Sequence, residues 1–76
     1  MTIEQFRIAM TRRPFIPFAI HLADGDRLPV RHPEQIAMSP GGRTVVVFGE
    51  GEAFSIVDLL LVTRLDVESP PPSPER

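Results

Sequence analysis

The middle of the chain, residues 18–67, is a series of short apolar runs separated by turn residues. The clearest run alternates between apolar and other positions, stops at Asp24-Gly25 and then resumes the alternation. Its apolar members are Phe18, Ile20, Leu22, Leu28 and Val30. Period-two alternation on both sides of an Asp-Gly pair is a strong signal for a β-hairpin. The pattern therefore predicts a small β-rich fold, of a kind that more often binds or assembles than catalyses.

A short helix is predicted ahead of this hairpin. Thr2 and Gln5 have the spacing of a capping box, and apolar residues follow at helical spacing from Ile3 to Met10. Pro14 disfavours helical geometry in the residue before it, so the helix is expected to end by residue 12 or 13.

Four more apolar segments predict further strand structure, at residues 35–39, 44–48, 53–57 and 62–67. Residues 44–48 are expected to be the most buried strand, because their apolar run is continuous. In residues 53–57 either Phe54 and Ile56 or Ser55 and Val57 face inward. Asp58 either caps a single helical turn or lies in a continuing strand. The phenylalanines expected in the core are Phe15, Phe18, Phe48 and Phe54.

Taken together, the segments predict a mainly β domain over residues 1–67, with one N-terminal helix and a small antiparallel barrel of five short strands. Residues 68–76 contain four prolines and two serines and are expected to form a disordered or polyproline-like tail. The tail includes a Pro-x-x-Pro-x-Arg sequence, which arises often by chance in such segments.

The composition says more about the cellular compartment of the protein than about its chemistry. The 76 residues have no cysteine and a net charge of −2, with arginine as the sole base apart from two histidines. The absence of cysteine excludes a disulfide framework and fits a reducing cytoplasm. No stretch predicts a membrane span or a secretory signal. The negative net charge argues against a general polyanion binder, which is usually basic.

No set of residues predicts catalysis or a cofactor. His21 and His32 lack the further ligands that a metal site needs, so surface or capping roles are expected. Asp24 fits turn chemistry, and Asp58 fits a helix cap better than a buried acid. An enzyme is the least favoured class, and no small-molecule substrate, cofactor or metal is expected.

The element order resembles the Sm-like family, especially the bacterial Hfq-type RNA chaperones, whose SH3-like barrel follows an N-terminal helix. The segment from Ile20 to Leu28 is similar to the first Sm motif. The sequence departs from the family at Val30, where a glycine is usual, and at Val57-Asp58-Leu59, where the late basic motif is expected. The resemblance therefore implies the fold and a ring-forming tendency, but no RNA-binding residues.

The chain resembles more closely a set of small uncharacterised bacterial proteins. They share the stretches found here as Arg13-Pro14-Phe15, His21 to Gly25, His32 to Glu34 and Ile56 to Val62. No activity is assigned to that set, so this likeness implies nothing about chemistry.

These observations predict a cytoplasmic, non-enzymatic binding or assembly module that associates with itself or with another protein. Self-association is expected because so small a domain leaves strand edges open, and open edges tend to pair. The alternative is an Sm-like RNA-binding protein that uses Arg12, Arg13, Arg31 and His32.

Overall fold

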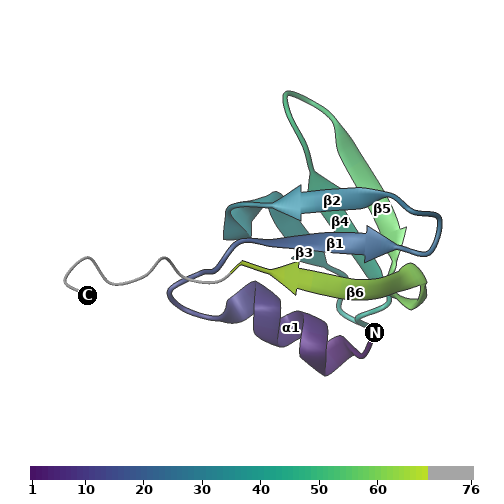
Figure 1. Ribbon diagram of the computed structural model, residues 1–76, viewed down its shortest axis with the longest axis horizontal. Helices are drawn as coiled ribbons and strands as arrows, with labels where there is room; N and C mark the ends of the chain where they lie inside the picture. Colours follow the sequence, from purple (N-terminus) through teal and green to yellow (C-terminus); the bar gives the residue numbers. More distant parts are fainter. Residues whose placement is uncertain (69–76) are drawn as a thin grey trace.

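The computed structural model describes residues 1–68 and contains one α-helix, six strands and two single turns of 3₁₀-helix (Figure 1). In chain order these are α1 (Ile3–Thr11), β1 (Phe18–Leu22), β2 (Arg27–Val30), η1 (Pro33–Gln35), β3 (Ile36–Met38), β4 (Thr44–Phe48), β5 (Phe54–Asp58), η2 (Leu59–Leu61) and β6 (Val62–Val67). The predicted tail from residue 69 onward lies outside the described residues.

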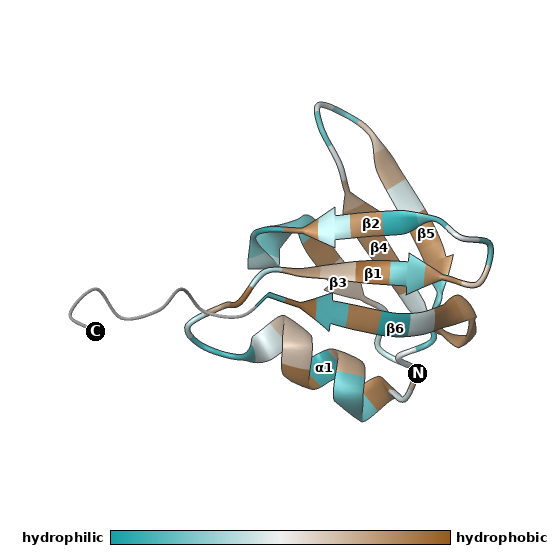
Figure 2. Ribbon diagram, viewed as in Figure 1, coloured by the Kyte–Doolittle hydropathy of each residue, from teal (hydrophilic) through white to brown (hydrophobic). Residues whose placement is uncertain are grey.

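The strands form two three-stranded antiparallel sheets, in the orders β2-β1-β6 and β3-β4-β5. In Figure 1 the strands of one sheet cross those of the other at a steep angle. The β4–β5 hairpin rises beyond the rest of the domain, and Figure 2 shows a hydrophilic tip above a hydrophobic stretch of β5.

The N-terminal helix begins and ends where the sequence predicts. Gln5 N–H donates to Thr2 Oγ1 at 3.1 Å, and Thr2 N–H donates back to Gln5 Oε1 at 3.3 Å. Arg12 is the C-terminal cap, two residues before Pro14. The helix buries Phe6 and Ala9, and the Phe6 ring packs edge-on against Phe18.

The hydrophobic core lies between the two sheets and α1. Both sheets, the helix and η2 contribute to it. Its buried members are Phe6, Ala9, Phe18, Ile20, Val30, Ile36, Val45, Val47, Val57, Leu59 and Val62. Because α1, η2 and all six strands supply a member, burial of apolar area joins the two sheets without a shared ladder of hydrogen bonds.

The expected five-stranded barrel is wrong in strand number and in closure. The described residues form six strands, and the two sheets are not joined into a closed barrel. Two 3₁₀ turns interrupt the strands. Pro33 begins η1 between β2 and β3, and Asp58 caps η2 between β5 and β6.

The expectation that β4 is the most buried strand is also wrong, since β1 has three buried residues and β4 has two. The strand alternates, with Val45 and Val47 buried and Thr44 and Phe48 exposed. In β5 the inward-facing residues are Ser55 and Val57, which settles the alternative left open by the sequence. The Phe48 and Phe54 side chains are therefore exposed, by 45% and 58%, on the outer face of their sheet.

Candidate binding surface at strand β5

Exposed apolar side chains are concentrated around β5. Among residues 1–68, seven large hydrophobic residues are exposed, and five of them lie in β5 or in the segments next to it. These five form what we term the β5 surface: Phe48, Phe54, Ile56, Leu60 and Leu61. Of these, Phe48, Phe54 and Ile56 share the outer face of their sheet, and a contiguous exposed apolar patch of this kind is typical of a binding site.

The two aromatic residues of this surface form a pair. Phe48 and Phe54 are directly opposite each other in the β4–β5 ladder, with ring centroids 6.1 Å apart. Val46 and Ile56 are the next pair on the same face. The solvent side of the sheet therefore presents an apolar row where a charged or polar one is usual.

The backbone of β5 is open toward solvent on the side away from β4. Hydrogen bonds from Gly49 N–H to Ala53 O and from Leu59 N–H to Arg43 O fix which residues bond across the ladder. Because bonded and non-bonded pairs alternate in an antiparallel ladder, Ser55 and Val57 bond to β4. The backbone groups of Phe54, Ile56 and Asp58 point to the open edge.

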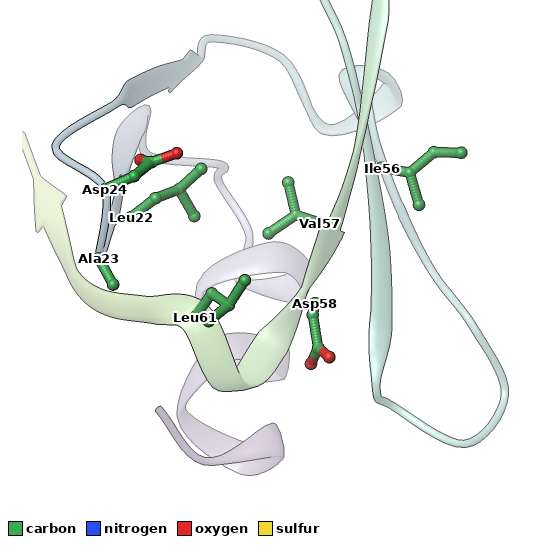
Figure 3. Close-up of a pocket in the computed structure, with 7 residues that line it drawn as sticks. All are labelled: Leu22, Ala23, Asp24, Ile56, Val57, Asp58 and Leu61. Carbon is green, nitrogen blue, oxygen red and sulfur yellow. The ribbon is translucent and has the colours of Figure 1, made fainter.

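A pocket of about 470 Å³ borders the β5 surface (Figure 3). It lies between the β1–β2 turn and the β5–η2 segment. Its lining residues are Leu22, Ala23, Asp24, Ile56, Val57, Asp58 and Leu61. Figure 3 shows Leu22, Val57 and Leu61 pointing toward one another, while Ile56 points to the other side of β5.

The two acidic side chains of this pocket, Asp24 and Asp58, accept hydrogen bonds from backbone N–H groups. Leu60 N–H donates to Asp58 Oδ1 at 3.0 Å, and Asp26 N–H donates to Asp24 Oδ1 at 2.9 Å. The predicted cap at Asp58 and the predicted turn role of Asp24 are both confirmed. The remaining lining is apolar, so the pocket is suited to an apolar side chain.

The four residues proposed for RNA contact come from two segments at one end of the molecule. Arg12 and Arg13 follow α1, and Arg31 and His32 follow β2; both elements end on the same side in Figure 1. Arg31 lies 3.8 Å from Glu68 Oε2, and Arg13 donates to Arg12 O at 2.8 Å. The backbone N–H groups of Arg31 and His32 both donate to the Gln35 side chain.

One of these residues lies near the exposed aromatic pair. Arg31 and Phe48 line the same shallow hollow, together with Glu50 among others. The Gln35 side chain also donates to Phe48 O at 3.1 Å, which connects the corner after β2 to β4. The sequence did not indicate this neighbourhood, because Phe48 and Phe54 were expected in the core and are instead exposed.

The other histidine, His21, lies away from these residues, on the outer face of the β2-β1-β6 sheet. His21 Nε2 is 2.8 Å from Asp66 Oδ2, although it is not aligned as a hydrogen bond. Arg64 lies 3.3 Å from the same carboxylate, and Arg27 is opposite His21 in the β1–β2 register. Among residues 1–68 there is no group of three His, Cys, Asp or Glu side chains able to hold a metal ion.

Comparison with protein-family models, with curated proteins and with solved structures finds no match to this chain. Within the described part of the chain, none of the helices is long and apolar enough to cross a membrane.

Proposed function

We propose that this protein is a non-enzymatic assembly module that associates with itself through the β5 surface. The observation that supports this proposal is the open edge of β5. Here exposed apolar side chains and unpaired backbone groups occur on the same short strand. Such an edge readily pairs with another chain.

The size of the domain gives the same expectation. A chain of 76 residues buries only about 60% of the surface of its unfolded state, so its own core is marginal. Burying one isoleucine side chain contributes about 1.5–3 kcal/mol. Contact through Phe54 and Ile56 would therefore add appreciably to the stability of the folded chain.

Light scattering coupled to size-exclusion chromatography tests this proposal with a matched pair of variants. Wild type should have a concentration-dependent mass above the 8.5 kDa of one chain. Ile56→Lys should remain monomeric, because it places a charge where apolar area is buried. Ile8→Lys changes a residue of similar exposure on α1, 64% against 68%, and should behave as wild type. A monomeric wild type would overturn the proposal.

RNA binding in the manner of Sm-like proteins is a second candidate. It is favoured by the shared hollow of Arg31 and Phe48, since bases stack on exposed aromatic rings and arginine pairs with phosphate. The same chromatography tests it. The chain has no Trp and no Tyr, so absorbance of the protein peak at 260 nm reports bound nucleic acid. Arg31→Glu should abolish that absorbance if this candidate is correct.

A further inference from the structure

We infer that two copies pair β5 against β5 in antiparallel orientation about a two-fold axis, with Ser55 of one copy opposite Ser55 of the other. The pairing would join two three-stranded sheets into one continuous sheet of six strands. This inference rests on the proposed self-association, and it adds which strand pairs, in which direction and in which register.

The open backbone groups limit the possible registers. Within β5 only Phe54, Ile56 and Asp58 direct their N–H and C=O groups to the edge. Each must therefore lie opposite one of these residues in the partner, or opposite Glu52, two residues before the strand. Their side chains share the outer face, since successive residues in a strand alternate. Shifting the pairing by one residue would bring closed groups to the interface.

Four two-fold registers bring Phe54 or Ile56 opposite an open β5 residue of the partner. With Val57 opposite itself, each Ile56 faces an Asp58 carboxylate. With Ile56 opposite itself, each Phe54 ring faces an Asp58 carboxylate. With Phe54 opposite itself, each Ile56 faces Glu52. With Ser55 opposite itself, each Phe54 faces Ile56, an aromatic and β-branched pair of the kind that stabilises antiparallel sheets. Only the register with Ser55 opposite itself pairs Phe54 with Ile56 on both sides of the two-fold axis.

The other three sheet edges are less suited to pairing. In β2 the edge residues include Pro29, which has no N–H, and Arg31, whose N–H donates to Gln35. β3 has three residues, and the Ile36 N–H donates to Pro33 O. β5 has no proline, and its first four residues are uncharged.

The β6 edge is open but mismatched to β5. The hydrogen bond from Glu68 N–H to Pro17 O sets the β1–β6 phase, so Leu65 directs its backbone to the edge. Its side chain packs against the core, whereas that of Ile56 faces solvent. Antiparallel pairing of β5 with β6 would therefore align a core face with a solvent face.

The acidic residues at the two ends of β5 weaken the proposed pairing but do not prevent it. The stretch Ala53–Val57 is uncharged, so no like charges meet in the central part of the contact. At each end Glu52 of one copy lies opposite Asp58 of the other, and these two like-charged pairs weaken the contact. A basic extended peptide would also suit these acids, and it is the competing occupant that the experiment must separate.

Single-cysteine scanning tests the register directly, because the chain has no cysteine of its own. Ser55→Cys places two thiols in a non-hydrogen-bonded pair, about 4.5 Å apart between Cα atoms and within disulfide range. Phe54→Cys and Ile56→Cys place their thiols on diagonals of about 8–9 Å, which a disulfide cannot span. Ala37→Cys, on the exposed face of β3, controls for random collision.

Each variant is oxidised in the full chain, and dimer formation is followed by intact mass. We expect Ser55→Cys to cross-link at least ten-fold faster than the other three variants. Faster cross-linking of Phe54→Cys or Ile56→Cys would overturn the register. If no variant cross-links faster than Ala37→Cys while wild type scatters as a dimer, β5 pairing is wrong and the proposed function stands. A monomeric wild type overturns both, and leaves a partner such as a basic peptide as the occupant.

Discussion

At the scale of single residues, the turn before β4 depends on one of two adjacent glycines. Gly42 has a φ of +80°, and a methyl group at its Cα would lie 2.8 Å from Ile3 Cδ1. Gly42→Ala should therefore destabilise the fold by about 1–2 kcal/mol from backbone strain, before any shift of Ile3. For a domain of this size that lowers the midpoint of thermal unfolding by about 4–16 °C.

The neighbouring glycine supplies the control for that measurement. Gly41 has no heavy atom within 4 Å of an added methyl group, and its φ is not in the left-handed region. Gly41→Ala should change stability by no more than about 0.5 kcal/mol. Thermal unfolding of both variants is monitored by circular dichroism. Equal melting temperatures would show that the turn does not need a left-handed residue at position 42.

Residue types alone predicted the caps and turns but misjudged the aromatic residues. Thr2, Asp24 and Asp58 act locally, because their side chains bond to backbone groups two or three residues away. Burial of Phe48 and Phe54 depends instead on which face of the sheet meets the core. That choice is made by the whole fold, and a run of apolar residues does not reveal it.

At the scale of the element, β5 provides a test of which backbone groups are free. Ile56→Pro removes an N–H that points to the open edge, so the β4–β5 ladder keeps its bonds. Circular dichroism should show a folded chain, while light scattering shows weaker self-association. Val57→Pro removes an N–H that bonds to β4 and should cost at least about 1–3 kcal/mol of stability. Unfolding by both prolines to the same extent would contradict the assigned hydrogen-bond phase.

The boundaries of helices and strands could be predicted where capping or turn residues mark them. The arrangement of these elements in space could not be predicted. The helix, the first hairpin and the strand at residues 44–48 follow from a capping box, an Asp-Gly turn and a Pro-Gly-Gly turn. Barrel closure depends on whether strands continue through His32-Pro33 and through Asp58-Leu59. In both places a proline or a cap replaces strand geometry by a 3₁₀ turn, and two separate sheets result.

At the scale of the whole molecule, salt should separate the two candidate functions. The proposed dimer places Glu52 of one copy near Asp58 of the other, so screening this repulsion should tighten self-association as salt rises from about 0.05 to 0.5 M. Nucleic-acid binding responds in the opposite direction, because its affinity falls as counterion release is suppressed. Sedimentation equilibrium over this salt range measures the association constant of the dimer. Glu52→Gln should raise this association constant at low salt and make it less dependent on salt. Self-association that weakens with salt would instead indicate contact between opposite charges, such as the arginines after α1 and β2 with the acids around β5.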